Sequence, residues 1–229
     1  MEINDPSFLA KAKLEDILVQ VLYNKYTGLV FHGGTAIWRC YSGNRFSRDL
    51  DFYLNSETAE KKMEYYREFS KFLQDSGLVI KEKGYSNSTD TMHFLVELDK
   101  TKMKVDINFR YKKGKMVDYA KIDDGKIAVL SLSPLELLNE KIVAYNDKLD
   151  NETGFKHPEA HDLYDMSYLV SLIEKPDRVT VEKLKILIGK VEKNPPSDMR
   201  SLAHLIIRGL PPSFELMVKK LREWIDDYN

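Results

Sequence analysis

Residues 28–54 read GLVFHGGTAIWRCYSGNRFSRDLDFYL, and the rest of the chain is organised around this stretch. The apolar residues 29–31 predict a short strand that ends at Gly33 and Gly34, and residues 35–41 read as a helix. A strand, a glycine turn and a helix N-terminus in this order leave unpaired backbone N–H groups facing one spot, which suits a phosphate. An ordinary strand-to-helix turn without a ligand is the alternative interpretation of the two glycines.

An acidic pair follows in the sequence DLDFYL, residues 49–54. The alternation of polar and apolar residues is typical of a strand, with Asp49 and Asp51 on one face and the apolar residues on the other. Two carboxylates side by side repel each other, and a bound divalent cation commonly neutralises this repulsion in proteins. The pair therefore predicts a metal site, and an exposed edge strand that carries two solvated acids is the alternative.

Two motifs in this stretch together carry a resemblance to a known family. They are His32-Gly33-Gly34-Thr35-Ala36 and Arg45-x-Ser47-x-Asp49-x-Asp51-Phe52. In this order they resemble the signature of the AbiEii-type toxin nucleotidyltransferases, which belong to the DNA polymerase β-like nucleotidyltransferase superfamily. The resemblance implies an α+β fold with a mixed sheet flanked by helices. It also implies transfer of a nucleoside monophosphate from a nucleoside triphosphate to an acceptor hydroxyl.

The composition sets limits on the class of protein. The chain has 229 residues, 43% hydrophobic and 31% charged, so we expect a soluble, globular protein with a sizeable core. Lys and Arg number 35 against 36 Asp and Glu, which excludes a global attraction to nucleic acid and leaves only a local polyanion site. The single cysteine, Cys40, excludes an internal disulfide and favours a reducing compartment. No apolar stretch is long enough to span a membrane and no signal-peptide pattern is present, so we expect a cytoplasmic protein without membrane contact.

The pattern of predicted elements changes once along the chain. Residues 1–130 read as mixed helices and strands, and residues 131–229 read as helices throughout, with a capping box at Ser133-Pro134-Leu135-Glu136. We therefore expect a nucleotidyltransferase α/β domain followed by a helical domain that closes the active-site cleft. The charged segment 111–125 is expected to be a solvated loop. Residues 171–229 carry dispersed basic residues, for which a solvated surface competes with an RNA-binding face.

A third acid lies on the polar face of another predicted strand. Residues 103–110 alternate in polarity, so that Asp106 shares one face with Lys104. In the superfamily a third acidic residue lies on a strand next to the acidic pair, and Asp106 is the matching position here. The resemblance then implies that Asp49, Asp51 and Asp106 hold the metal, with two Mg²⁺ ions expected and Mn²⁺ as an alternative, and that Asp106 accepts the proton of the acceptor hydroxyl.

The same resemblance implies a nucleotide site. Gly33, Gly34 and Thr35 would hold the β- and γ-phosphates through N–H groups and the threonine hydroxyl. Arg45, which precedes the acidic strand, is expected to reach a phosphate or to pair with one of the carboxylates there. Ser47 is expected to contribute to the nucleotide site or simply to shape the turn.

Two further motifs extend the resemblance into the helical half. Residues 137–142, LLNEKI, resemble the family helix whose lysine faces the nucleotide, which implies a catalytic, phosphate-binding Lys141; a surface lysine whose stem lies along the helix is the alternative. Residues 161–166, HDLYDM, resemble the family motif Arg-Asp-x-x-Asp-Leu and imply that Asp162 orients Lys141 or acts at the acceptor. His161 stands where the family usually has arginine, so no phosphate contact is assigned to it.

The family also implies substrates and a partner. Its members inhibit growth by nucleotide addition, in known cases to the acceptor end of tRNA, and a separate antitoxin is encoded alongside. We therefore expect a toxin of a toxin–antitoxin, or abortive infection, system that uses a nucleoside triphosphate and tRNA. Two alternatives stay open: the same fold acting on a small molecule or a protein side chain, and a non-catalytic nucleotide-binding module.

Overall fold

The structure is a computed structural model that describes residues 3, 5–55, 58–150 and 158–228. It divides into two compact units, which we call unit 1 (residues 1–42 and 46–132) and unit 2 (residues 43–45 and 133–229). The expected α+β class is confirmed, since a mixed sheet and helices are both present. Within the described part of the chain, no helix has the length and apolar character needed to cross a membrane.

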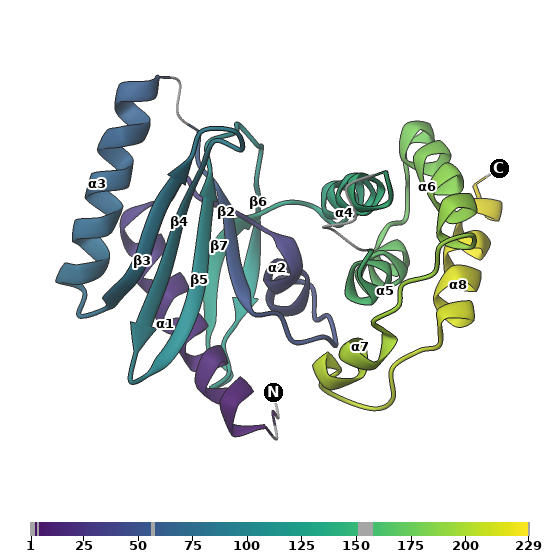
Figure 1. The fold of residues 1–229 in the computed structure, drawn as a ribbon, viewed down its shortest axis with the longest axis horizontal. Coiled ribbons are helices and arrows are strands. Elements are labelled where there is room, and N and C mark those ends of the chain that lie inside the picture. The colour runs from purple at the N-terminus through teal and green to yellow at the C-terminus, as the bar shows by residue number, and fades with distance from the viewer. Residues whose placement is uncertain (1–2, 4, 56–57, 151–157, 229) are drawn as a thin grey trace. The chain divides into compact units, whose positions relative to one another are not determined.

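Unit 1 is built on one seven-stranded sheet (Figure 1). Its helices and strands are α1 (Pro6–Lys25), β1 (Val30–His32), α2 (Gly33–Cys40), β2 (Asp49–Tyr53), α3 (Ala59–Asp75), β3 (Val79–Ser86), β4 (Thr91–Leu98), β5 (Thr101–Asn108), β6 (Lys115–Ala120) and β7 (Lys126–Ser131). The strand order is β3-β4-β5-β2-β1-β7-β6. β2 runs parallel to β5, and β1 runs parallel to β7, whereas the other neighbouring pairs are antiparallel.

One face of this sheet forms the core of unit 1. Phe52 in β2, Ile107 in β5 and Phe94 in β4 are fully or almost fully buried. Helices α1 and α3 cover this face, since the ring of Tyr23 in α1 lies edge-on to Phe52 and the ring of Phe69 in α3 packs against Phe94. Because side chains alternate along a strand, the polar residues of β2, β4 and β5 lie on the opposite face.

The charged segment 111–125 is not a loop throughout, and that prediction was wrong. Its residues Lys115–Ala120 form β6, which pairs with β7 at the edge of the sheet. Charged residues, lysine above all, are common on edge strands because they discourage pairing with another chain. Tyr119 in β6 is nevertheless fully buried. A run of charges therefore did not exclude a strand here.

Unit 2 is helical, as the sequence pattern predicts. Its elements are α4 (Pro134–Leu149), α5 (Ala160–Leu169), the short 3-10 helix η1 (Val170–Leu172), α6 (Arg178–Val191), α7 (Met199–Leu205) and α8 (Phe214–Asp226). The expected capping box is present at the start of α4, where the Ser133 and Glu136 side chains bond each other's backbone. Leu138 in α4, Leu163 in α5 and Leu187 in α6 are fully buried and form part of its core.

Unit 2 also includes the short segment 43–45 from the loop between α2 and β2. The side chain of Asn44 donates to the carbonyl of Arg208 at 2.7 Å and accepts from its N–H at 3.1 Å. Arg45 forms an isolated β-bridge with Ile206. Hydrogen bonds of the Asn44 side chain and a β-bridge thus join residues that are far apart in the sequence, which the change of pattern near residue 130 did not indicate.

Candidate active site

The candidate active site is a set of carboxylates on the unit 1 sheet. In the parallel pair β2 and β5, Asp49 lies opposite Lys104, and Asp51 lies opposite Asp106. Opposite residues on neighbouring strands point to the same face, so all three aspartates lie on the face away from the core. Asp49 is exposed, and Asp51 and Asp106 are half-buried. The structure therefore brings the three predicted carboxylates to one face of the sheet.

The double glycine lies directly beside this acidic face. Helix α2 begins at Gly33, so the predicted helix start at Thr35 was wrong. Gly33 has a φ of +74°, and a Cβ atom on it would lie 2.4 Å from Oδ2 of Asp51. Glycine adopts this backbone conformation without strain, and only a residue without a Cβ can approach the carboxylate so closely. The first N–H groups of α2, which have no partner within a helix, therefore lie beside Asp51.

Thr35 has a structural role that the sequence did not indicate. Its side chain is fully buried, and its hydroxyl donates to the backbone carbonyl of Asp49 at 2.6 Å. A hydroxyl has one proton, so it cannot donate to a phosphate while this bond is made. The hydroxyl contact that the family implies is therefore not available in this arrangement. The backbone N–H of Thr35, in the first turn of α2, remains a candidate donor.

Two nitrogen groups hold the carboxylate of Asp106. Nζ of Lys104 donates to Oδ2 of Asp106 at 2.7 Å, and Nδ1 of His93 lies 3.0 Å from Oδ1. Lys104 is on the same strand as Asp106, and His93 lies directly opposite Asp106 on β4. Both carboxylate oxygens therefore have a partner, and the orientation of this carboxylate is fixed.

The charges on this face change one another's pKa. Partial burial raises the pKa of Asp49; Lys104 opposes the rise, and the negative charge of Asp106 adds to it. Burial alone would lower the pKa of Lys104, but its hydrogen bond to Asp106 and the charges of the three aspartates outweigh burial and raise it. Lys104 therefore stays charged at neutral pH, and it balances one of the three negative charges.

The three aspartates are a donor set that suits a divalent metal ion, because Mg²⁺ and Mn²⁺ prefer carboxylate oxygens. Their ligand atoms are not drawn tightly together, since the only described residues with three such atoms all within 4.8 Å of one another are in unit 2. On the sheet, Lys104 lies against Asp106 instead. The residues therefore fit a metal by their chemistry and by sharing one face, with the side chains of Asp49, Asp51 and Asp106 in a more open arrangement.

Three predicted residues, Arg45, Lys141 and Asp162, lie in unit 2. Together with Lys148 and Asp165 they form a group that we call the ionic cluster. Nε and Nη2 of Arg45 donate to the two oxygens of Asp165 at 2.8 and 2.7 Å. Nζ of Lys141 lies 2.7 Å from Oδ1 of Asp162 and 2.8 Å from Oδ2 of Asp165. Lys148 donates to Oδ2 of Asp162 at 2.6 Å. The carboxylate that Arg45 contacts here is that of Asp165 on α5, a pairing that the sequence did not indicate.

The ionic cluster is largely buried, and each of its charged groups is paired with at least one group of opposite charge. Asp162 and Asp165 are 3% and 1% exposed. Burial alone would raise the pKa of both carboxyls, but Lys141 for Asp162 and Arg45 for Asp165 lead the charges that outweigh it and lower both pKa values. For Lys141 burial lowers the pKa, and the two aspartates reverse this and raise it. All of these groups are therefore ionised at neutral pH.

Among the residues that the structure describes, one close group of potential metal ligands lies at the start of α5. Single ligand atoms of Glu159, His161 and Asp162 all lie within 4.8 Å of one another. Lys148 donates to both Glu159 and Asp162, so a cation already bridges the two carboxylates. Burial lowers the pKa of His161, and the charge of Arg45 adds to this effect. The structure therefore describes this group as an ion-paired cluster with a neutral imidazole.

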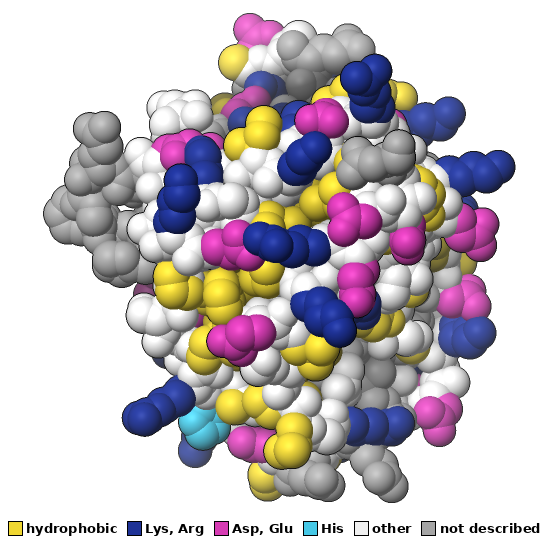
Figure 2. Space-filling view, turned by 90° about the vertical axis from the view of Figure 1, so that its right-hand side faces the viewer, with side chains coloured by type: hydrophobic (Ala, Val, Ile, Leu, Met, Phe, Trp, Pro, Cys, Tyr) yellow, Lys and Arg dark blue, Asp and Glu magenta, His cyan; other side chains and the backbone are white. Residues whose placement is uncertain are grey.

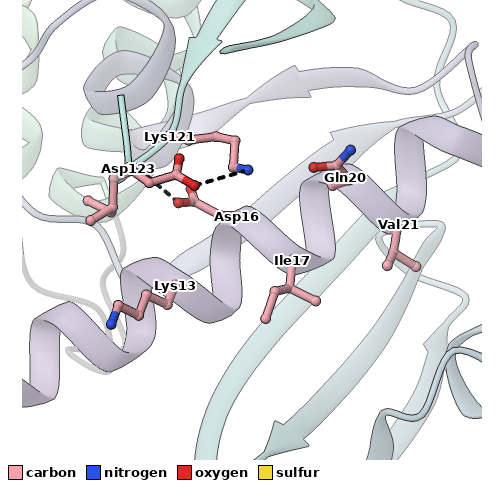
Figure 3. Close-up of a pocket in the computed structure, with 8 residues that line it drawn as sticks. Lys13, Asp16, Ile17, Gln20, Val21, Lys121 and Asp123 are labelled. Atoms are coloured by element: carbon pink, nitrogen blue, oxygen red, sulfur yellow. Dashed lines mark hydrogen bonds and ion pairs between the residues drawn. The ribbon is translucent and has the colours of Figure 1, made fainter. Parts of the chain in front are cut away.

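One cavity of unit 1 lies away from the predicted site residues. It has a volume of 410 Å³ and is lined by α1 and by the turn between β6 and β7 (Figure 3). Asp16 on α1 accepts from the N–H of Ile122 at 2.9 Å, and Lys121 lies 3.5 Å from Asp123. The residues that line this cavity are therefore the ones that pack α1 against the β6–β7 hairpin.

The surface that carries α6 and α8 has charges of both signs (Figure 2). Blue Lys and Arg side chains alternate there with magenta Asp and Glu side chains and with hydrophobic patches. One such pair joins Arg222 on α8 to Glu192 just after α6. A surface of this kind lacks the one-sided positive charge that is typical of nucleic-acid binding.

Sequence reasoning missed three residues that contact the predicted ones. Lys104 stands two positions before Asp106 on the same strand, so the period-2 alternation places both on one face and was a usable signal. His93 reaches Asp106 only through the register of β4 and β5. Lys148 bonds Asp162 from α4.

Ser47, which the sequence predicted either for the nucleotide site or for the shape of the turn, is buried, with 9% of its surface exposed.

Comparison with known proteins connects these residues to a family. The sequence matches, over residues 16–223, the family described as "Nucleotidyl transferase AbiEii toxin, Type IV TA system". No curated protein gave a match to the sequence.

Solved structures from two organisms have the same fold. JHP933 from Helicobacter pylori has a TM-score of 0.62 at 18% sequence identity, with 97% of this chain and 91% of that chain covered. MenT4, a nucleotidyltransferase toxin from Mycobacterium tuberculosis, also has a TM-score of 0.62, at 17% identity, with 97% of this chain and 85% of that chain covered. Identities this low establish similarity of fold alone.

Proposed function

This chain belongs to the AbiEii family of nucleotidyl transferase toxins, and from that premise we propose that it is a Mg²⁺-dependent enzyme that transfers a nucleoside monophosphate from a nucleoside triphosphate to tRNA. The observation that carries the proposal is the strand register that sets Asp51 beside Asp106, with Gly33 packed against Asp51. An acidic face beside a helix N-terminus is what nucleotidyl transfer needs, since the metal-bound triphosphate and its attacking hydroxyl must meet there.

The three aspartates are proposed to hold the divalent ions. Bound there, such ions would neutralise charge on the attacking and leaving oxygens. Asp49 and Asp51 would bind on the side of the triphosphate, and Asp106 on the side of the acceptor. The raised pKa of Asp49 reflects burial and crowding of negative charge, which a bound cation would relieve.

The chain's own groups are proposed to bind phosphate and to move one proton. Backbone N–H groups of Gly33, Gly34 and Thr35 would hold the β- and γ-phosphates at the N-terminus of α2. Asp106 would accept the proton of the attacking hydroxyl, and its contacts to Lys104 and His93 fix its orientation for that step.

Lys141 is proposed to bind a phosphate of the nucleotide, with Asp162 orienting its ammonium. An ammonium has three donors, and the bonds to Asp162 and Asp165 use two of them. The side chain of Lys141 is 13% exposed, so it retains a small accessible surface. Arg45, held by both oxygens of Asp165, is proposed to fix Asp165 and not to bind a phosphate.

The biological setting is proposed from the family. A chain of a type IV toxin–antitoxin family is expected to have a cognate antitoxin encoded alongside and to act in the cytoplasm. A neighbouring reading frame that encodes a small winged-helix-like protein would support this setting.

Label transfer tests the proposed reaction. The purified protein is incubated with Mg²⁺, total RNA and each of the four nucleoside triphosphates, labelled at the α-phosphate. We expect label in the tRNA fraction, because the α-phosphate stays with the transferred monophosphate, and no transfer from a γ-labelled triphosphate.

The control is Asp49→Ala, which should transfer nothing. Label that appears in a protein or small-molecule fraction would redirect the proposal to another acceptor. The absence of transfer from all four nucleotides, identical in the wild type and Asp49→Ala, would refute it.

A further inference from the structure

A hollow of 310 Å³ lies on the same face of the sheet as the three aspartates. We call it the β3–β5 hollow, because its lining comes from β3, β4 and β5. The lining side chains that point to this face are Glu82, His93, Leu95 and Lys104, together with the position of Gly84. Its volume is at the lower end of the range of roughly 300–1,000 Å³ for ligand pockets, so it suits one small group and not a folded segment.

The β3–β5 hollow adjoins Asp106 through two shared residues. His93 and Lys104 line the hollow, and the same two residues hold the two oxygens of Asp106. A group that occupied the hollow would therefore lie next to the carboxylate that is proposed to accept the acceptor's proton. This step rests on the proposed function.

Two side chains of the lining, Lys104 and His93, keep hydrogen-bonding capacity for a ligand after their bonds to Asp106 are made. Asp106 takes one of the three donors of the Lys104 ammonium, whose side chain is 49% exposed. Nδ1 of His93 faces Asp106, and no contact between the described residues involves its Nε2. The ammonium suits a phosphate, and Nε2 suits a ribose hydroxyl or a base amine.

The lining also offers a flat and apolar surface. The imidazole of His93, 37% exposed, and the side chain of Leu95 stand side by side on β4. Bases in single-stranded RNA stack on such rings and apolar side chains. The ammonium of the neighbouring Lys83 lies instead over the ring of Tyr66 on α3, so Lys104 supplies the positive charge of the hollow.

From this chemistry and position, we infer that the β3–β5 hollow binds the terminal nucleotide of a single-stranded RNA acceptor end. Lys104 would contact its phosphate, His93 and Leu95 would support its base, and its hydroxyl would face Asp106. Glu82 adds an acceptor for base amino groups. The hollow would thus determine which chain end reaches the acidic face.

Gly84 allows a direct test. A Cβ at Gly84 would meet no atom within 4 Å, and its φ is not in the left-handed region. A side chain at position 84 therefore enters the hollow with its Cβ free of clashes, and we choose Gly84→Val because valine is well suited to a strand. Gly28→Val is the matched control, because a Cβ at Gly28 also meets open space and Gly28 lies outside the hollow.

Two quantities are measured for the wild type and both variants: the Kd for tRNA by fluorescence anisotropy, and the KM for tRNA and for the nucleoside triphosphate. We expect Gly84→Val to raise the Kd and KM for tRNA by about tenfold or more, as loss of one base contact would. Its KM for the nucleotide and all values of Gly28→Val should stay at the wild-type level.

The outcomes separate this inference from the proposed function. Unchanged tRNA affinity in Gly84→Val overturns the inference even if label transfer to tRNA is normal. A raised KM for the nucleotide alone would assign the hollow to the nucleotide and also overturn it. The wild type could bind tRNA more tightly than Gly84→Val and still transfer no label. That result would refute the proposed reaction and support the hollow as a tRNA-binding site.

A second pair of variants guards against misfolding of Gly84→Val. Leu95→Glu and Leu95→Gln have nearly the same shape and differ in charge. The inference expects weaker tRNA binding for Leu95→Glu than for Leu95→Gln, with a difference that shrinks as salt is added. Equal affinities at low salt would contradict it.

Discussion

Gly33 is the residue at which the geometry of the site is most tightly constrained. Its φ of +74° is a conformation that L-amino acids with a side chain rarely adopt. The carboxylate of Asp51 occupies the space in which a Cβ of residue 33 would lie. The two constraints are independent, because one concerns the backbone and the other the neighbouring strand. Gly33 therefore holds the N-terminus of α2 and the acidic face in contact.

Gly33→Ala is expected to reduce label transfer by at least about a hundredfold, since a displacement of about 1 Å in a catalytic group has effects of this size. The left-handed conformation should also cost about 1–2 kcal/mol of stability. Transfer rate and thermal unfolding are measured side by side with Gly28→Ala, which should change neither. A normal rate for Gly33→Ala would mean that the position of Asp51 against α2 is not needed.

Glu15 is a second residue with a testable consequence, this time in the core of unit 1. It is fully buried, Nε of Arg39 is 4.0 Å from it, and neither carboxyl oxygen has a hydrogen-bond partner in the described structure. Burial raises its pKa well above the ordinary value of 4.5, by more than Arg39 lowers it. The folded state therefore binds this proton more tightly than the unfolded state.

The contribution of Glu15 to stability is largest below pH 4.5 and is lost as the pH rises from there toward its folded-state pKa. We expect Glu15→Gln to remove this part of the slope, so that the variant gains stability relative to the wild type as the pH increases. Urea unfolding from pH 4 to pH 8 measures it, and parallel curves for the two proteins would contradict the burial argument.

At the scale of elements, α4 and α5 meet through the ionic cluster. Asp165 accepts from both Arg45 and Lys141, so its loss leaves two buried cations with fewer partners. Removing one member of a buried ion pair typically costs about 3–5 kcal/mol. We expect Asp165→Asn to destabilise the protein by about that amount in denaturant unfolding. Asp150→Asn, which breaks an exposed pair with Lys190, should cost under about 1 kcal/mol.

The same cluster makes unit 2 sensitive to acid. The pKa values of Asp162 and Asp165 are lowered in the folded state, so their contribution is present above the ordinary value of 3.8 and is lost as the pH falls below it. Asp165→Asn should therefore lose less stability than the wild type between pH 4 and pH 2. An identical loss in both proteins would show that the pair does not carry the acid sensitivity.

At the scale of the whole molecule, local patterns predicted more than long-range pairings. Period-2 alternation alone was enough to place Asp49 and Asp51 on one face, and a capping box with Ser133 as the N-cap marked the start of α4. The pairing of Arg45 with Asp165 joins residues 120 positions apart, and no local pattern encodes it. The contact of His93 with Asp106 depends on the register of a hairpin. Periodicity tells which face a residue occupies but not which distant residue lies opposite.

Metal binding can be tested on the intact protein without any measurement of activity. A ligand that binds only the folded state at 100 times its Kd stabilises it by about 2.7 kcal/mol. For a chain of this length each kcal/mol raises Tm by roughly 2–4 °C. We therefore expect saturating Mg²⁺ or Mn²⁺ to raise the Tm of the EDTA-treated protein by roughly 5–10 °C.

The variants then locate the ion. Asp106→Asn should lose most of the metal-dependent rise in Tm, because it removes one of three carboxylates from the acidic face. Asp118→Asn, on the exposed edge strand β6, should keep it. His161→Gln tests the competing group in unit 2, where Lys148 already bridges Glu159 and Asp162. The metal-dependent rise in Tm could instead survive in Asp106→Asn and disappear in His161→Gln. That result would place the metal at α5 and refute the assignment of Asp49, Asp51 and Asp106 as its ligands.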